Sequence, residues 1–359
     1  MNNIIDRNSP APLYQQVKSW LERSIRSGIF RPGSRLPSEN EFSQQCGIHR
    51  NTVRNALFRL EQEGVLCSVP GSGWFVSGGK EFPRRVAILA LRDIDKKKSN
   101  PRSEFLPRVT EGLHTGAALY GFEIVRLTAD ESARLLQGEL CDCPLDALIV
   151  NNFQSKYLEQ LRLLKSKLPL VVFNRQVFGE DIPCVCVDQY CGPRDLLTRL
   201  IQNGHRRIGC ITMALEPNWR YALERYRGYV DAFAEAGLAT EKKLLCQIRD
   251  FKQSRRRIRD FLKNNTDMTA LFIAGEIFHK STLELLQKQG RRIPEDISVV
   301  AFDRVSGELG KQIISLDQPL EEMGKRVFRV LNDVFAGKTV TGEILLTNIT
   351  QGSSIRRLD

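Results

Sequence analysis

From residue 86 onward, short apolar runs alternate repeatedly with helical stretches. The runs are rich in Val, Ile and Leu, and each has the length of a β-strand. Strands are expected over 86–91, 122–127, 145–150, 170–173, 184–187, 208–212, 270–273, 297–302 and 344–349. Because buried strands that alternate with helices pair in parallel, the pattern predicts parallel sheets flanked by helices. So many strands favour two α/β lobes over one.

The first 77 residues have a different pattern, which begins with an amphipathic helix. Apolar residues recur there at three- and four-residue spacing, which places them on one buried face of a helix. These residues are Leu13, Val17, Trp20, Leu21 and Ile25.

Two shorter helices are expected next. Ser38 and Glu41 have the spacing of a capping box, which predicts a helix that begins at Ser38 and ends at Gly47. A second helix is expected over 50–63. Its buried face is predicted to consist of Val53, Ala56, Leu57 and Leu60. Two short helices joined by a Gly-containing turn form a helix-turn-helix.

The N-terminal end of that second helix carries side chains suited to reading DNA. In a helix-turn-helix the second helix enters the major groove, where Arg pairs with guanine and Asn with adenine. Arg50, Asn51, Thr52 and Arg54 lie there, and a hairpin predicted over 65–76 would form a wing. Residues 1–85 hold 12 Lys and Arg against 7 Asp and Glu, and the whole chain carries +11. This basic excess points to a polyanion such as nucleic acid.

The N-terminal segment resembles the GntR family of bacterial transcription regulators. The resemblance is carried by residues 12–17, 33–39, 50–54 and 64–76. It implies that a set of residues lies at or near DNA. With Asn51, the expected DNA-binding set is Arg35, Ser38, Glu39, Arg50, Asn51, Thr52, Arg54 and Gly71. Asn40 stands where many members carry a basic residue, so the base preference is left open.

Polar side chains follow many of the predicted strands of the larger part. In parallel sheets, ligands bind beyond the carboxyl ends of the strands. The strand-end pairs are 92–93, 151–152, 174–175, 188–189, 275–276 and 303–304. A polar cleft of this kind suits a polyhydroxylated ligand, and Phe105, Phe178 and Trp219 are candidate aromatic faces for a sugar ring.

Residues 86–359 resemble the LacI/GalR effector domain, which is related to periplasmic sugar-binding proteins. The resemblance is carried by 171–175, 204–209, 225–229, 293–303 and 317–319. It implies contacts with sugar hydroxyls for several residues near the strand ends, and Glu276 departs from the usual residue there. The expected effector-binding set is Phe105, Arg175, Trp219, Arg225, Glu276, Asp303 and Gln318.

Three parts are therefore expected. They are a winged helix-turn-helix DNA-binding domain of α+β class over 1–77, a linker over 78–85, and a two-lobed α/β, periplasmic-binding-protein-like domain with parallel sheets over 86–359. The last part is expected to bind the effector and to dimerise. This pairing resembles the arabinose-repressor type of bacterial regulator.

The expected function is sequence-specific regulation of transcription, as a repressor. The protein is predicted to be a cytoplasmic homodimer that binds double-stranded operator DNA with an affinity set by a small sugar-like effector. No signal peptide or membrane span is predicted. No catalytic residue, cofactor or metal is predicted either.

Other interpretations stay open. The same architecture could sense a purine or nucleoside, or act as a repressor without an effector. The lysine run at 96–98 leaves a sugar phosphate open as the ligand, although a lysine run in a loop is usually only solvated. Some GntR-type proteins carry an aminotransferase-like domain, but no lysine here lies in a cofactor-binding context. Zinc at the pairs Cys141/Cys143 or Cys184/Cys186 is disfavoured, because zinc needs four placed ligands.

Overall fold

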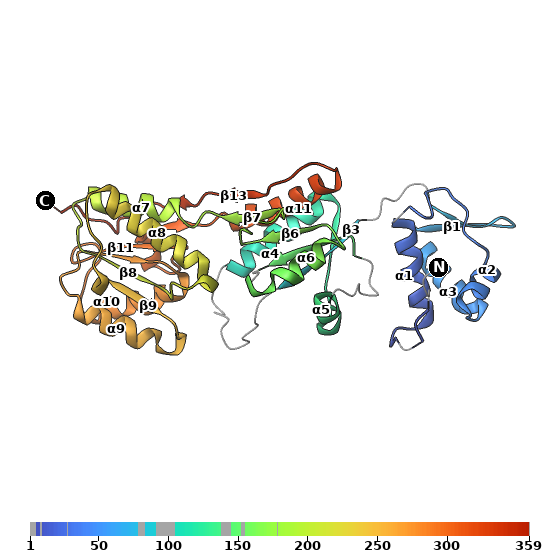
Figure 1. The fold of residues 1–359 in the computed structure, drawn as a ribbon, viewed down its shortest axis with the longest axis horizontal. Coiled ribbons are helices and arrows are strands. Elements are labelled where there is room, and N and C mark those ends of the chain that lie inside the picture. The colour runs from blue at the N-terminus through green and yellow to red at the C-terminus, as the bar shows by residue number, and fades with distance from the viewer. Residues whose placement is uncertain are drawn as a thin grey trace. The chain divides into compact units, whose positions relative to one another are not determined.

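The computed structural model describes residues 5–7, 9–26, 28–77, 83–90, 105–137, 145–151, 155–177 and 179–358. The chain forms two compact units. Figure 1 shows its helices and strands. The first holds residues 1–89, 121–148 and 159–169, and the second holds residues 90–120, 149–158 and 170–359. Among the described helices, none has the length and apolar character needed to cross a membrane.

The N-terminal part is a winged helix-turn-helix. It contains α1 (Leu13–Arg26), α2 (Glu39–Cys46), α3 (Arg50–Gln62), β1 (Leu66–Val69) and β2 (Gly73–Val76). The two strands pair antiparallel and form the hairpin expected after the second short helix. The three helices and the hairpin enclose one apolar core.

Local sequence signals place α2 and α3 as predicted. The Ser38 hydroxyl accepts a hydrogen bond from the Glu41 amide at 3.3 Å, and the Glu41 carboxylate accepts one from the Ser38 amide at 2.7 Å. Gly47 ends α2 with φ of 60°, in the left-handed region. The predicted apolar face of α3 is fully buried. One residue of the α1 pattern differs, because Leu13 is 39% exposed at the first turn of the helix, where the core does not cover it.

One six-stranded sheet has the order β14-β12-β11-β10-β8-β9. Its strands pair in parallel, except β14, which runs antiparallel to β12. The strands are β8 (Ile208–Met213), β9 (Leu245–Ile248), β10 (Ala270–Ile273), β11 (Ser298–Phe302), β12 (Ile314–Asp317) and β14 (Asn348–Ile349).

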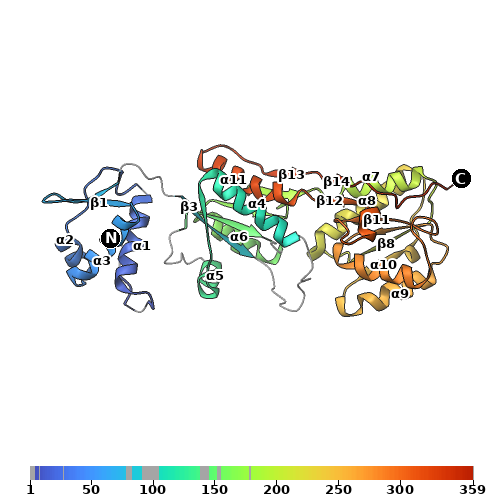
Figure 2. The ribbon, with the colours of Figure 1, turned by 180° about the vertical axis from the view of Figure 1, so that it is seen from behind.

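Helices cover both faces of this sheet. The helices α7 (Cys191–Gln202) and α8 (Arg220–Glu235) share one apolar core with it, and α9 (Ser254–Asn264) and α10 (His279–Lys288) share another. Figures 1 and 2 show the two helix pairs on opposite sides of the strands. This is the parallel α/β lobe that the strand–helix alternation predicts.

The other six-stranded sheet has the order β13-β7-β6-β5-β3-β4. Its strands are β3 (Arg84–Ala90), β4 (Phe122–Val125), β5 (Ala147–Asn151), β6 (Leu170–Phe173), β7 (Cys184–Val187) and β13 (Glu343–Leu345). The pairs β3–β4, β6–β7 and β7–β13 are parallel. The accompanying helices are α4 (Phe105–Tyr120), α5 (Ala129–Leu136), α6 (Leu158–Lys165) and α11 (Leu320–Phe335).

The structure corrects the predicted strands in three places. The single strand expected over 344–349 is divided into β13 and β14, which belong to different sheets. Strands β9 and β12 lie in segments where no strand was expected. Strand β3 begins at Arg84, inside the expected linker, because Arg84 and Arg85 pair with Phe122 and Glu123 of β4.

Candidate functional site

The N-terminal turn of α3 presents the candidate base-reading side chains to solvent. Arg50, Asn51 and Arg54 are exposed, and Thr52 is partly exposed. The helix begins after His49, whose Nδ1 accepts a hydrogen bond from the Asn51 amide at 3.2 Å. A side chain that accepts from the backbone at this position stabilises the start of the helix. His49 therefore caps the helix that carries the candidate DNA contacts.

Glu39 joins two of these arginines. Its carboxylate accepts hydrogen bonds from Arg50 Nε at 2.8 Å and from Arg54 Nη2 at 2.8 Å. The Glu39 side chain is only 14% exposed, whereas the two arginine side chains are about half exposed. The hydrogen bonds from Arg54, assisted by those from Arg50, lower the pKa of Glu39 to about 2. Glu39 thus stays ionised and fixes two guanidinium groups side by side at the surface.

The remaining candidates for DNA contact have distinct local roles. Arg35 is exposed and forms an antiparallel bridge with Phe75, so the segment before α2 lies beside the hairpin. The Ser38 hydroxyl is used as the cap of α2. Gly71 lies at the tip of the hairpin with φ of 77°, a conformation that other residues adopt only with strain.

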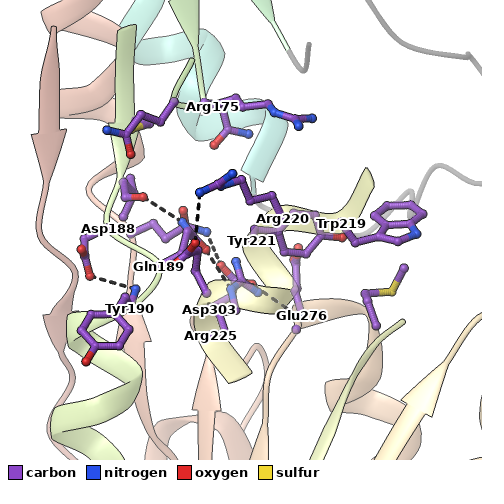
Figure 3. A pocket seen from close by; sticks show the side chains of 18 of the residues that line it. Arg175, Asp188, Gln189, Tyr190, Trp219, Arg220, Tyr221, Arg225, Glu276 and Asp303 are labelled. Atoms are coloured by element: carbon purple, nitrogen blue, oxygen red, sulfur yellow. Dashed lines mark hydrogen bonds and ion pairs between the residues drawn. The ribbon is translucent and has the colours of Figure 1, made fainter. Parts of the chain in front are cut away.

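A cavity of about 660 Å³ opens in the second unit. It lies at the carboxyl ends of β6, β7, β10, β11 and β12, and the start of α8 also lines it. The structure brings together all seven residues of the expected effector set, drawn in part in Figure 3. They are Phe105, Arg175, Trp219, Arg225, Glu276, Asp303 and Gln318. Parallel strands bring these side chains to one edge because their carboxyl ends meet there.

An ion pair between the buried Arg225 and the partly buried Asp303 lines this pocket. The Arg225 side chain is 7% exposed, and its Nη1 lies 3.8 Å from Asp303 Oδ2. Arg225 also donates to Gln189 Oε1 and to the Ala274 carbonyl, both at 2.8 Å. Its guanidinium lies 3.5 Å from the centroid of the Phe302 ring. Burial lowers the pKa of Arg225, and the charge of Asp303 opposes that shift.

Asp303 is held from several directions. Its carboxylate accepts hydrogen bonds from the Glu276 amide at 3.3 Å and from Gln318 Nε2. Among the residues that the structure describes, Asn174 and Asp303 are the only ones other than glycine with positive φ, at 61° and 70°. Both line the pocket. Strained backbone of this kind often marks functional sites, and the sequence gives no local signal for it beyond the Asn and Asp residue types.

Some lining residues were not in the expected set. Gln189 holds Arg225, and Arg220 and Tyr221 begin α8 beside the pocket. Asp188, a strand-end residue, instead caps α7, because its Oδ1 accepts from the amides of Tyr190 and Cys191 at 3.0 and 2.5 Å.

Other candidates of the sequence analysis lie outside the described residues. They are Phe178, the strand-end residues 92, 93 and 152, the lysines 96–98, and Cys141 and Cys143. Cys184 and Cys186 are buried in β7 with free thiols. Within the described ranges, no group of three or more His, Cys, Asp and Glu side chains is placed to hold a metal ion.

His279, the first residue of α10, is expected to make the stability of the protein depend on pH. It is 5% exposed, its Nε2 lies 2.8 Å from the Phe302 carbonyl, and burial lowers its pKa to about 4. As the pH falls, His279 in the unfolded chain therefore takes up a proton near pH ~6.5, before His279 in the folded chain does. Stability is kept above that pH and falls by up to about 3 kcal/mol as the pH drops to about 4. Urea unfolding at both ends of this range should show a smaller acid loss for His279→Gln. His114→Gln, which replaces an exposed histidine, is the control and should lose as much stability in acid as the wild type. An equally large loss in His279→Gln would contradict this assignment.

Comparisons with known proteins agree with this architecture. The family model for bacterial regulatory proteins of the gntR family matches residues 13–76, and that for the periplasmic binding protein-like domain matches residues 197–355. The chain is 33% identical over 322 residues to the HTH-type transcriptional regulator CelR of Thermobifida fusca, covering 85% of this chain and 94% of that protein. It is 26% identical over 345 residues to the arabinose metabolism transcriptional repressor of Geobacillus stearothermophilus, covering 92% of this chain and 93% of that protein.

A solved structure shares the fold over most of the chain. A transcriptional regulator CelR–cellobiose complex has a TM-score of 0.62 at 22% identity, and the match covers 89% of this chain and 100% of that one. The relatives span both the DNA-binding part and the pocket-bearing part. The chain therefore belongs to the same family of HTH-type bacterial transcriptional regulators as CelR, with a gntR-type DNA-binding domain joined to a periplasmic-binding-protein-like domain.

Proposed function

We propose that this regulator represses transcription from the operator it binds, and that a sugar-like effector in the pocket sets its affinity for that operator. The observation that carries the proposal is the ion pair between the buried Arg225 and the partly buried Asp303 in the strand-end cavity. Two relatives bear names or titles that concern a sugar, the arabinose repressor and the CelR–cellobiose complex. The site of action would be the cytoplasm, where the operator lies.

The chemistry of the pocket suits a polyol. A sugar hydroxyl both donates and accepts hydrogen bonds, so its site needs carboxylates and cationic or amide donors close together. Asp303 and Glu276 supply acceptors, and Arg225 and Gln318 supply donors. Because Arg225 and Asp303 are already held by neighbouring groups, little conformational entropy is lost when a ligand binds. Phe105, Trp219 and Phe251 add apolar surface for the carbon face of a ring.

The DNA-binding part is proposed to act as a dimer. Two copies of α3 would read two half-sites of a pseudo-palindromic operator, as dimeric helix-turn-helix proteins do. Arg50 and Arg54, both held by Glu39, present adjacent guanidinium groups at the end of the helix that enters the groove. The eight residues of the expected DNA-binding set form this proposed interface with the tip of the hairpin.

Replacing Arg50 with Ala is expected to weaken operator binding by about 1–3 kcal/mol, about 5- to 150-fold in Kd, if its side chain reads a base. The operator is first selected from random DNA by the full chain, and affinity is then measured by fluorescence anisotropy. Arg256→Ala on α9, whose side chain is 77% exposed, is the matched control. Operator affinity equal to that of the control would remove Arg50 from the interface.

A thermal-shift screen of the full chain tests the effector class. The panel contains pentoses, hexoses, disaccharides, sugar acids, sugar phosphates and purine nucleosides. A ligand present at about 100 times its Kd should stabilise the protein by about 2.7 kcal/mol. The proposal expects hits among the sugars or their derivatives. Hits confined to the purine nucleosides, or no hit at all, would contradict a sugar effector.

A further inference from the structure

Two arginines gather in one part of the effector pocket. Arg175 follows β6, and Arg220 is the first residue of α8. Both line the cavity, and Figure 3 shows Arg175 at the top of the view and Arg220 between it and the group of Arg225, Asp303 and Glu276 below. The half-buried position of Arg175, together with the charge of Arg220, lowers the pKa of Arg175. Two like charges therefore lie close enough to influence each other.

Three acidic residues of the pocket already have other contacts. Asp188 is engaged by the backbone at the start of α7, and Asp303 is engaged by Arg225 and Gln318. Glu224 lies 3.5 Å from Arg220 and 3.9 Å from Arg227, so its charge is shared between two cations. The Arg220 side chain remains 47% exposed, so it can also bind a ligand.

The backbone adds to the positive potential at this place. Helix α8 begins at Arg220, directly after the 3-10 turn Pro217–Trp219, and the side chain of its N-cap residue, Trp219, makes no capping hydrogen bond. Trp219, Arg220 and Tyr221 all line the cavity, so the positive end of the helix dipole lies at the cavity wall. A guanidinium group binds a carboxylate or a phosphate through two parallel hydrogen bonds, and an anion between two such groups relieves their repulsion.

We propose that the effector is an acidic sugar, with its hydroxyls at Arg225, Asp303 and Glu276 and its carboxylate or phosphate between Arg175 and Arg220. This inference rests on the proposed sugar-sensing function and narrows the chemical class of the ligand to acidic sugars. The cavity of about 660 Å³ has room for one or two sugar rings with such a group. The acid fixes the orientation of the ring, because only one end of the pocket accepts an anion.

Isothermal titration calorimetry on the full chain tests the anion site with matched ligands. Each aldose of a panel (glucose, galactose, mannose, arabinose and xylose) is compared with its uronate or aldonate and with its terminal phosphate. The acid form is expected to bind at least about tenfold tighter than its parent aldose, which corresponds to about 1.4 kcal/mol. A preference for the carboxylate or for the phosphate identifies the source of the charge.

Variants assign the preference to the two arginines. Arg175→Gln and Arg220→Gln should each lose most of the preference for the acid, measured in each variant as the ratio of the Kd of the aldose to the Kd of its acid. Arg220→Lys should keep part of the preference, because the charge remains. Arg256→Gln on α9 is the control, and circular dichroism checks that each variant is folded.

The outcomes separate this inference from the proposed function. An aldose that binds as tightly as its acid, or tighter, would overturn the anion site and leave sugar sensing intact. A preference for the acid that survives in both glutamine variants would also overturn the assignment. If neither the aldoses nor their acids bind, and no disaccharide stabilises the chain in the thermal-shift screen, the proposed sugar-sensing function fails as well.

Discussion

Arg225→Ala is expected to lower the free energy of unfolding of the effector domain by about 3–5 kcal/mol and to abolish effector binding. The change leaves the partly buried Asp303 without its cation and the Ala274 carbonyl without its donor. The stacking of the guanidinium on Phe302 is lost as well. Urea unfolding followed by circular dichroism measures the stability, and calorimetry measures the binding. Affinity for operator DNA should change little, because α3 lies in the other compact unit.

A double-substitution cycle separates the ion pair from simple loss of packing. Asp303→Asn removes the charge that Arg225 faces, so Arg225→Met together with Asp303→Asn leaves no unpaired charge. The double variant should be more stable than the sum of the two single losses predicts, by at least about 0.5 kcal/mol. Additive losses would mean that the two groups do not depend on each other.

Gly112→Ala is expected to destabilise the effector domain by about 2–3 kcal/mol, because α4 and α11 touch through their backbones. A Cβ at Gly112 would lie 2.2 Å from the Glu321 carbonyl oxygen, and one at Gly324 would lie 2.6 Å from the Leu113 amide nitrogen. Neither contact can be relieved by a side-chain rotation. Alanine normally stabilises a helix by about 1 kcal/mol relative to glycine. A loss of stability in Gly112→Ala would therefore come from the steric clash and not from helix propensity.

The same substitution should also weaken effector binding. Helix α11 begins at Leu320, directly after Gln318 and Pro319, so a shift of the helix moves Gln318 in the pocket. Arg108 on α4 reinforces this link, since it donates to Glu321 at 2.6 Å and to the Gln318 carbonyl at 3.1 Å. Thermal unfolding and calorimetry measure the two effects. Ala118→Ser, on the exposed face of α4, is the control, and equal behaviour of the two variants would disprove the close contact.

The parts of the fold that local signals encode could be predicted from the sequence. The capping box at Ser38 places α2, and the apolar period of α3 places its buried face. The bounds of β6, β7 and β10 agree with the predicted runs to the residue, because each is a short, wholly apolar segment.

The strands that the sequence did not predict are defined by tertiary contacts. Strand β9 has only four residues, and one of them is the polar Gln247, so its sequence is not a continuous apolar run. Its pairing with β8 defines it as a strand. Strand β12 is defined in the same way by its pairing with β11. The division of 344–349 occurs because the chain passes from one sheet to the other there, and hydrophobicity alone carries no sign of that passage.

The candidate site was predictable to a similar extent. Strand ends converge in any parallel sheet, so the seven expected effector residues meet in one cavity. The role of Gln189 and the nearness of Arg220 to Arg175 depend on how β7 and α8 face each other, which no local pattern reveals. The use of Asp188 as a helix cap also becomes visible only in three dimensions.

Occupancy of the pocket is expected to control operator binding. Labelled operator DNA is titrated with the full chain and followed by fluorescence anisotropy, with and without a saturating concentration of the ligand found by thermal shift. The operator Kd is expected to change about 5- to 150-fold, equivalent to a coupling free energy of about 1–3 kcal/mol. A ligand that binds the pocket and leaves the operator Kd unchanged would show that the pocket does not control operator binding.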